Sequence, residues 1–315
     1  MGICRPRRSM ALFLVATTVP AVLLVSGCQQ VDNAVSGQLR IATGAPTAVY
    51  YRYGSALRDL LRGQLPRTRP TVLVTAASAE NITMVEHGEA EIGFAQADNT
   101  NTAAPGSIKA LARLYDDCLH LVVRADGPIH SLADLAGHPV SIGEVRSGTQ
   151  FTALRLLSVG GIDPDRDIAV RRLGLDDSVA ALLDRRVDAF FFSGGLPVAA
   201  ITQLARQTSI RLIDLRAYVT PLREAFGDHY TERLVPRSTY GVEPVVSISI
   251  ANYLIVSSTM SDEMAYAVTR ALFTGRDQIA SAHPVGASLN VRNAISTPPL
   301  SLHQGAARYY RSIKT

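Results

Sequence analysis

Strand-like and helix-like segments alternate along most of this chain, and that alternation most constrains its fold. Residues 39–43, 71–77 and 91–96 have the apolar, β-branched character of strands, and residues 51–62 and 80–87 between them carry apolar residues at helical spacing. Strands that alternate with helices predict a mostly parallel sheet with crossover helices on its faces. We therefore expect an α/β fold.

A second alternating set begins after a break at residues 124–128. Its expected strands are 139–143, 168–173, 187–192 and 210–215, and its expected helices are 131–136, 149–159, 178–185 and 198–206. The remaining segments are a strand at 119–123, to which residues 110–115 lead, a long strand at 245–256, an irregular stretch at 219–242, a long helix at 262–283 with Ser261 as its N-cap, and a closing helix at 302–313. These patterns favour two α/β lobes.

The lobes are expected to be discontinuous in sequence. Residues 38–123 and 248–315 form the first predicted lobe, and residues 124–247 form the second. The chain would then cross between the lobes near 124–128 and again near 240–248, and a cleft would lie between them.

The N-terminus has the pattern of a secretory signal. Arg5, Arg7 and Arg8 precede an apolar run from Met10 to Val25. A bilayer-spanning helix needs about 20 apolar residues, so this run is short for a span and suits the central region of a signal peptide. The signal places the mature chain outside the cytoplasm.

The run ends in Val25-Ser26-Gly27-Cys28, which resembles a lipobox. Residues 1–27 would then be removed, Cys28 would carry the lipid (palmitate) that anchors the protein to the membrane, and residues 28–37 would be a tether. A plain signal peptide and an uncleaved anchor are the alternatives.

Charge and cysteine content exclude several functions. The net charge of +4 includes three signal arginines and no signal acids, so the mature chain is near +1 and nothing predicts a nucleic-acid partner. Besides Cys4 and Cys28 there is Cys118, in an apolar run, where a buried and inert thiol is expected. No disulfide framework is predicted.

Enzymatic motifs are missing from the sequence. It has no GxxxxGK[ST], HExxH, CxxC, GxSxG or GxGxxG pattern, and the spacing in His87-Gly-Glu-Ala-Glu91 does not suit zinc. We therefore predict no catalytic residues, no metal and no cofactor.

Small polar turns follow several of the expected strands. They contain Thr43-Gly44, Ser78 with Asn81, Gln96, Ser147-Gly148-Thr149 and Gly194-Gly195-Leu196-Pro197. The carboxyl ends of strands line the ligand crevice in open parallel sheets, and free backbone N–H groups at helix starts attract anions there. Helix capping alone is an alternative explanation for Ser78 and Ser147. Turns of this kind in both lobes favour a single ligand cleft.

These segments resemble the TAXI family of solute-binding proteins, the extracytoplasmic receptors of TRAP-type secondary transporters. The resemblance spans about residues 38 to 283. It is carried by Thr43-Gly44, Val49-Tyr-Tyr-Arg-Tyr-Gly54, Ser78-Ala-Glu-Asn81, Gly88-Glu-Ala-Glu-Ile-Gly93, Ala110-Leu-Ala-Arg-Leu-Tyr115, Ser147-Gly-Thr149, Val187-Asp-Ala-Phe-Phe-Phe192 and Gly194-Gly-Leu-Pro197. Ala48 and Ala77 depart from it, because the family usually has glycine at both positions.

The resemblance implies a two-lobed, type II periplasmic-binding-protein fold that closes on a small solute. The solute would be a carboxylate, either an amino acid or a dicarboxylate or keto acid. The receptor, expected to be a monomer, would deliver this solute to a TRAP-type membrane permease and perform no covalent chemistry.

The resemblance also suggests roles for particular residues. Adjacent residues at a helix start point about 100° apart, so Tyr51 is expected to reach the ligand, Tyr50 to border the pocket and Tyr53 to pack. Asn81 and Gln96 both donate and accept hydrogen bonds, which suits an amino acid or a keto acid.

At the predicted start of the helix after residue 147, Ser147, Gly148 and Thr149 would hold a carboxylate with their hydroxyls and backbone amides. The other expected ligand-binding residues are Thr43, Gly44, Ser78, Gly194, Gly195 and Pro197. Candidate counter-charges are Arg52, Arg124 and Arg146.

Two other functions remain open from the sequence. The chain would fit a ligand-presenting subunit of a membrane sensor kinase, which differs from a transport receptor only in its partner. It would also fit a secreted α/β enzyme whose site carries no known motif.

Overall fold

The computed structural model describes residues 1–2, 34–46 and 48–314. The predicted signal peptide and Cys28 lie outside the described residues. From residue 34 onward the described chain belongs to one compact unit. None of its helices is long and apolar enough to cross a membrane.

Ten strands and eleven α-helices are present in the described residues. The strands are β1 (Gly37–Ala42), β2 (Thr68–Leu73), β3 (Ile92–Gln96), β4 (Ile108–Arg124), β5 (Pro139–Ser141), β6 (Ala169–Arg171), β7 (Ala189–Gly194), β8 (Ile210–Leu212), β9 (Tyr230–Val235) and β10 (Val245–Ser257). The helices are α1 (Val49–Gln64), α2 (Ser78–Glu86), α3 (Gly148–Val159), α4 (Leu175–Leu183), α5 (Ala199–Gln207), α6 (Val219–Phe226), α7 (Arg237–Tyr240), α8 (Asp262–Thr274), α9 (Arg276–Ala282), α10 (Val291–Ala294) and α11 (Gln304–Ser312). Among the short 3₁₀ turns, η1 (Ala97–Thr102) and η4 (Pro284–Ser288) bear on the site.

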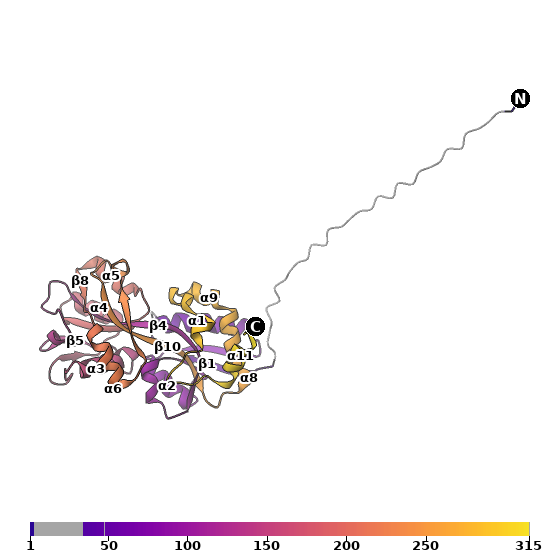
Figure 1. Cartoon of the computed structure of the whole chain (residues 1–315), viewed down its shortest axis with the longest axis horizontal. Coiled ribbons are helices and arrows are strands. Elements are labelled where there is room, and N and C mark those ends of the chain that lie inside the picture. Colours follow the sequence, from indigo (N-terminus) through magenta and orange to yellow (C-terminus); the bar gives the residue numbers. More distant parts are fainter. Residues whose placement is uncertain (3–33, 47, 315) are drawn as a thin grey trace. The chain divides into compact units, whose positions relative to one another are not determined.

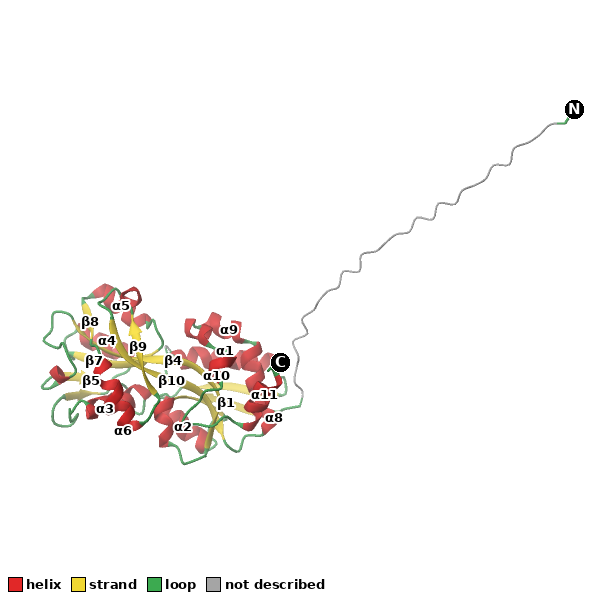
Figure 2. Cartoon of the chain, in the orientation of Figure 1, coloured by secondary structure: helices red, strands yellow, loops and turns green. Residues whose placement is uncertain are grey.

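The strands form one continuous mixed sheet in the order β2-β1-β3-β10-β4-β7-β5-β6. Strands β1, β2 and β3 are parallel to one another, as are β5, β6 and β7, which agrees with the predicted crossover topology. Strands β4 and β10 pair antiparallel in the middle of the sheet. Strand β8 pairs antiparallel with the end of β4, and β9 pairs antiparallel with the start of β10. Figure 2 shows this central sheet in yellow with helices on its faces.

Two lobes arise because β4 and β10 change partners along their length. Residues 108–118 of β4 pair with β10, and residues 118–124 pair with β7 and β8. In β10, residues 252–256 pair with β3 and residues 245–250 pair with β9. Figure 1 shows the result, with the early and late parts of the chain at one end and the middle part at the other. The predicted two-lobed α/β fold is confirmed.

The lobe limits predicted from the sequence stay a prediction. The pairing nonetheless has a clear feature: residues 118–123, which belong to the first predicted lobe, pair with strands of the second. Partners change inside the two long strands and not in a loop.

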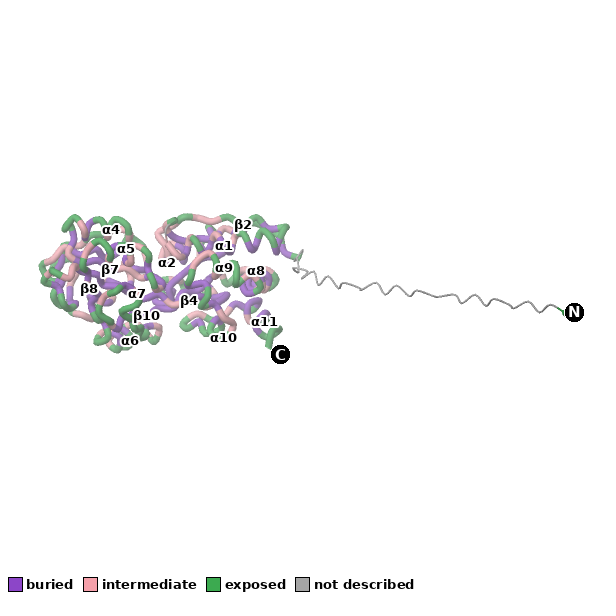
Figure 3. Tube along the Cα trace, turned by 90° about the horizontal axis from the view of Figure 1, so that it is seen from above, coloured by how far each residue is buried: buried purple, intermediate pink, exposed green. Residues whose placement is uncertain are grey.

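Buried apolar side chains cover the sheet on both faces. In the first lobe α1, α8 and α11 pack around Tyr53, Leu57 and Leu272, and in the second lobe α4 and α5 pack over Phe190. All five residues of β3 are buried, as expected of a strand covered on both sides. Figure 3 shows this continuous buried interior in purple.

The prediction of an irregular stretch at 219–242 was wrong. It holds α6, β9 and α7. Pro221 lies in the first turn of α6, where its missing N–H breaks no helical bond, and Pro236 is the N-cap residue of α7. The prolines that suggested irregularity therefore mark helix starts.

Two other boundaries differ from the sequence prediction. The helix expected at 262–283 is broken at Gly275 into α8 and α9, because Gly275 lies so close to Leu60 of α1 that a β-carbon there would overlap its side chain. The strand expected at 119–123 is the second half of a longer strand, β4, which also includes residues 110–115. Ser261 caps α8 as predicted, accepting a hydrogen bond from the backbone N–H of Met264 at 3.3 Å.

Candidate functional site

A cavity of about 1230 Å³ lies between the two lobes. The first lobe contributes the start of α1, the turn before α2, the end of β3 and the loop after α9. The second lobe contributes the loop before α3, the start of α4, the end of β7 and the start of α5. The middle of β4 forms part of the wall through Tyr115 and Asp117.

Of the predicted ligand-binding residues, nine line this cavity and four do not. Those in the lining are Tyr50, Ser78, Gln96, Ser147, Gly148, Thr149, Gly194, Gly195 and Pro197. Those outside the lining are Thr43, Gly44, Tyr51 and Asn81. Turns that are far apart in sequence therefore meet at one cavity.

Tyr50 forms part of the aromatic wall. Its ring stacks on Phe94 at a centroid distance of 5.1 Å. Its hydroxyl donates to Asn252 Oδ1 and lies 3.3 Å from Ser78 Oγ. Burial raises the pKa of this phenol, and the nearby Asp117 carboxylate raises it further. Tyr50 is thus a neutral, fully anchored side chain.

The two neighbouring tyrosines have different surroundings. Tyr51 is half-buried and outside the cavity lining. Tyr53 is fully buried, edge-on to Phe94 and stacked on Tyr115, so the prediction that it packs is confirmed.

Asn81, Thr43 and Gly44 lie behind the wall. Asn81 Nδ2 donates to the backbone oxygens of Thr43 at 2.7 Å and Phe94 at 2.8 Å, and its Oδ1 accepts from Thr75 at 2.6 Å. Thr43 Oγ1 donates to the Leu73 carbonyl at 2.7 Å. These bonds tie together the ends of β1, β2 and β3.

The start of α3 faces the first lobe across the cavity. Ser147 caps the helix, its Oγ accepting from the backbone N–H of Gln150 at 3.1 Å, which is the alternative role considered for it from the sequence. Thr149 Oγ1 accepts from the backbone N–H of Ser193 at 3.1 Å. The backbone N–H groups of Gly148 and Thr149 have no acceptor among the described residues, as is usual in the first turn of a helix. They are free to receive an anion.

Gln96 and Gly148 bring the lobes together at this point. A β-carbon on Gly148 would overlap Gln96 Oε1 and crowd Ser78 Oγ. Gln96 Nε2 also donates to Ser193 Oγ of the second lobe at 2.5 Å. Ser78 does not cap α2, since its Oγ accepts instead from the backbone N–H of Gln96 at 3.1 Å.

A second contact between the lobes lies beside the cavity. The buried carboxyl of Asp98, in η1, accepts from Thr152 Oγ1 of α3 at 2.6 Å and from the Tyr230 hydroxyl of β9 at 3.2 Å. Arg155 donates to the Asp98 carbonyl at 3.1 Å and lies over the ring of Phe151 at 4.2 Å. This network holds η1 against the second lobe.

Charged side chains at the cavity are of both signs. Arg52 and Arg206 line it, as do the carboxylates of Glu144, Asp176 and Asp177. His283 also lines it, but burial and the nearby Arg52 lower the pKa of its imidazole and favour the neutral form. Of the arginines predicted as counter-charges, Arg124 is paired with Asp126 at 3.0 Å, and neither it nor Arg146 lines the cavity. In the described residues, no three His, Cys, Asp or Glu side chains are grouped to hold a metal ion.

Asp117 is one of the lining residues that were not predicted from the sequence, and it is the most deeply buried carboxyl among them. It is 5% exposed, and burial raises the pKa of its carboxyl from 3.8 to about 7. The signal was present in Tyr115-Asp116-Asp117-Cys118, since two successive acids in a strand point to opposite faces and one must face inward.

The shared central strands and the cleft between the lobes define the periplasmic-binding-protein class of fold. The chain is similar to a putative L-cystine ABC transporter protein from Listeria monocytogenes, with a TM-score of 0.54 at 14% identity over 81% of this chain and 98% of that one. It is also similar to the periplasmic aliphatic sulphonate binding protein SsuA from Escherichia coli, with a TM-score of 0.51 at 16% identity over 88% of this chain and 84% of that one.

A further likeness is to the alkanesulfonate-binding protein SsuA from Xanthomonas axonopodis pv. citri bound to MOPS, with a TM-score of 0.51 at 17% identity over 87% of this chain and 83% of that one. Identities this low establish the fold and nothing more. The family is established separately: residues 41–313 match the NMT1-like family, and the chain belongs to it.

Proposed function

We propose that this protein is an extracytoplasmic solute receptor, of the TAXI type, that delivers a small carboxylate to a TRAP-type permease. The observation that carries this proposal is the cavity of about 1230 Å³ lined from both lobes, which are joined by two continuous strands. A solute that contacts both walls favours the state in which they are close together.

The anionic end of the solute is received at α3. The free backbone N–H groups of Gly148 and Thr149 point out of the first turn of a 12-residue helix, where the helix dipole favours negative charge. Arg52 and Arg206 add positive charge to the cavity wall. The proposed contact residues are the nine in the lining, together with Asp117 and Arg52.

The remaining predicted residues have indirect roles in this proposal. Thr43, Gly44 and Asn81 shape the wall from behind through the hydrogen bonds of Asn81 and Thr43. Tyr51, which the sequence predicted as a ligand contact, lies outside the lining, so this proposal assigns it no contact with the solute, and Tyr51→Phe tests that assignment.

The proposal includes location and partners. A signal peptide at 1–27 exports the chain, Cys28 carries a lipid, and the protein acts as a monomer beside the permease. The pattern of Arg5 to Cys28 supports export and anchoring.

The test begins with a thermal-shift screen of amino acids, dicarboxylates and keto acids, followed by calorimetric titration of those that stabilise the protein. We expect at least one carboxylate to bind and to be recovered unchanged, and small-angle scattering to show a smaller radius of gyration at saturation. Arg52→Gln should weaken binding of an anion a few-fold, as expected for a partly exposed charge worth about 0.2–1 kcal/mol.

Arg58→Gln on the same helix is the matched control, because Arg58 pairs with Asp59 and lies outside the cavity. Chemical conversion of the solute would contradict a receptor and indicate an enzyme. Binding without any change in the radius of gyration would contradict closure.

A further inference from the structure

Three buried polar atoms without a hydrogen bond of ordinary geometry lie together beside the cavity, and two of them belong to residues that line it, Gln96 and Asp117. The three atoms are Gln96 Oε1, Asp117 Oδ1 and Asn252 Nδ2, and none has such a bond within the described part of the chain. Their residues lie on the adjacent strands β3, β10 and β4, with Gln96 directly opposite Asn252. Asn252 Nδ2 is a donor that faces the Asp117 carboxyl and lowers its pKa. Gln96 Oε1 has no donor among the described residues, and since buried polar atoms are nearly always paired, it indicates a missing hydrogen-bonding group.

The bonds already made show what that group must be. Gln96 Nε2 donates to Asp117 Oδ2 at 2.9 Å and to Ser193 Oγ at 2.5 Å, which uses both hydrogens of the amide. Gln96 Oε1 is a free acceptor, and the Asp117 carboxyl, which Asn252 and Gln96 already approach, has lone pairs for a further hydrogen bond. Two acceptors require a hydrogen-bond donor between them. Because one acceptor belongs to a carboxyl group, a protonated amine is the donor that also neutralises the negative charge of the carboxylate.

No protein cation fills this role. Among the described residues, no Lys, Arg or His forms an ion pair with Asp117. The charged groups that act on its carboxyl are Asp116 on the same strand and Asp98 in η1, both negative. Tyr50 and Tyr115 also face it, and burial raises the pKa of each phenol, so that they remain neutral.

The amine acceptors are next to the carboxylate site. Gln96 Oε1 is in contact with Gly148, whose backbone N–H is free at the start of α3. A carboxylate at α3 and an amine at Gln96 and Asp117 would thus belong to neighbouring atoms of one small molecule.

We infer that Asp117 is the residue by which the cavity selects its solute, accepting with Gln96 the protonated amine of an α-amino acid whose carboxylate lies at the start of α3. This rests on the proposed function and narrows it, since oxo acids and simple dicarboxylates have no such amine.

The pH dependence has a definite sign. The carboxyl of Asp117 has a pKa of about 7 in the empty protein, so it is neutral at pH 6 and charged at pH 8. An ammonium group binds the charged form. Affinity for an amino acid should therefore rise with pH through 7, with release of a proton from Asp117 below that pH, whereas affinity for an oxo acid should fall or stay level.

The experiment is calorimetric titration at pH 6 and pH 8 with matched probes: L-glutamate and 2-oxoglutarate, L-leucine and 4-methyl-2-oxopentanoate, L-phenylalanine and phenylpyruvate. We expect at least one amino acid to bind roughly tenfold or more tightly than its oxo acid, because the charged hydrogen bond is absent from the latter. Repeating the titration at pH 6 in buffers of different ionisation enthalpy measures the released proton and needs no variant.

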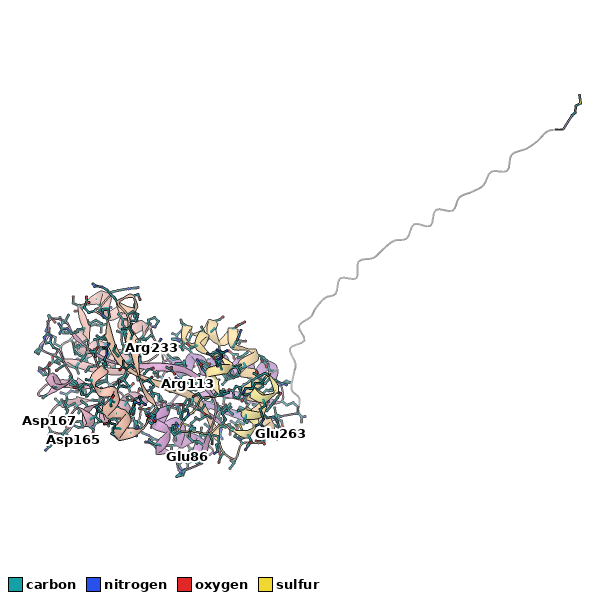
Figure 4. The ribbon with its side chains drawn as sticks, viewed as in Figure 1. Glu86, Arg113, Asp165, Asp167, Arg233 and Glu263 are labelled. Carbon is teal, nitrogen blue, oxygen red and sulfur yellow. The ribbon has the colours of Figure 1, made fainter. Side chains whose placement is uncertain are left out.

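Asp117→Asn should weaken binding of that amino acid roughly ten- to a hundredfold and leave its oxo acid unaffected or bound more tightly. Asp116→Asn is the matched control. The Asp116 side chain pairs at 2.7 Å with Arg113, which Figure 4 labels near the middle of the molecule, and neither residue lines the cavity.

Two outcomes separate this inference from the proposed function. If oxo acids bind as tightly as their amino acids, or no proton is released, the role of Asp117 is wrong and the receptor stands. If no amino acid, dicarboxylate or keto acid of the thermal-shift screen binds, the proposed carboxylate receptor fails and the inference fails with it.

Discussion

Gln96 of the first lobe lies in van der Waals contact with Gly148 of the second, with no room for a side chain between them. Gln96 cannot swing aside freely, since its amide is bonded to Asp117 and to Ser193. The closest approach of the two lobes therefore depends on the absence of a side chain at residue 148.

Gly148→Ala should hold the lobes apart. Its methyl group would displace Gln96 and break a hydrogen bond to a carboxyl, so we expect roughly a tenfold or greater loss of solute affinity and a radius of gyration that no longer falls on binding. Scattering and titration measure both. Gly174→Ala is the control, because a β-carbon there would meet only Glu144 Oε2, at 3.8 Å. Equal affinities for the two variants would argue against a tight contact at Gly148.

The buried carboxyl of Asp117 should make the empty protein less stable at alkaline pH. Because folding raises its pKa from 3.8 to about 7, its contribution to stability is complete below pH 3.8 and is lost as pH rises through 7. Asp117→Asn removes this loss, so its gain in unfolding free energy over wild type should be about 2 kcal/mol larger at pH 8 than at pH 5. Urea unfolding at both pH values measures it, with Asp116→Asn as control. A pH-independent difference would show that the carboxyl is not buried in the neutral form.

Ala77 has a backbone conformation that suits glycine. Its φ of 80° and ψ of −143° lie in a region that side-chain-bearing residues rarely adopt. Ala77→Gly should stabilise the protein by about 1 kcal/mol, the relief of strain exceeding the added chain entropy of glycine. Ala79→Gly, two residues into α2, should instead destabilise by about 0.5–1 kcal/mol. The denaturation midpoints of the two variants measure these effects. If both substitutions destabilise the protein, Ala77 is not strained.

Tyr50→Phe and Tyr51→Phe should differ in their effects. The first leaves the buried Asn252 Oδ1 without its donor, which costs about 1–3 kcal/mol and loosens the cavity wall. The second removes a hydroxyl outside the lining, and we expect little change in melting temperature or solute affinity. Tyr53→Phe is a third arm: its hydroxyl has no partner within the described residues, so its loss should be neutral or stabilising. A larger loss of affinity for Tyr51→Phe than for Tyr50→Phe would restore Tyr51 as the ligand contact.

Cys28→Ser tests the membrane anchor. If Val25-Ser26-Gly27-Cys28 is a lipobox, this variant should be released from the membrane fraction or remain unprocessed. Fractionation with mass measurement of the N-terminus distinguishes the cases. Wild-type protein that keeps its first 27 residues in the membrane would indicate an uncleaved anchor.

The sequence predicted the alternation of strands and helices well, because crossover units leave strong apolar periodicities. It failed at 219–242, where three short elements begin or end at residues such as Pro221 and Gly241 that also mark loops. It also predicted only the second half of β4 as a strand, because Asp116 and Asp117 interrupt an apolar run that is continuous as a strand.

The sequence could not predict which side chains of the site point into the cavity. The turns at strand ends were identifiable, and most of them meet at the cavity. Which of two adjacent tyrosines faces inward depends on the rotation of α1, and that rotation is set by Tyr53 packing on Phe94 and Tyr115. The role of a buried acid such as Asp117 can be inferred only from its neighbours Gln96 and Asn252, which are distant from it in sequence.

The position of β10 in the sheet determines the order in which the molecule can assemble during synthesis. This strand is the last to be made, yet it lies between β3 and β4, so the two edges it joins stay open until it emerges. A nascent chain that stops before Asn252 has no partner for Gln96 and exposes strand edges that invite aggregation. Neither lobe can therefore complete its sheet until β10 has been made.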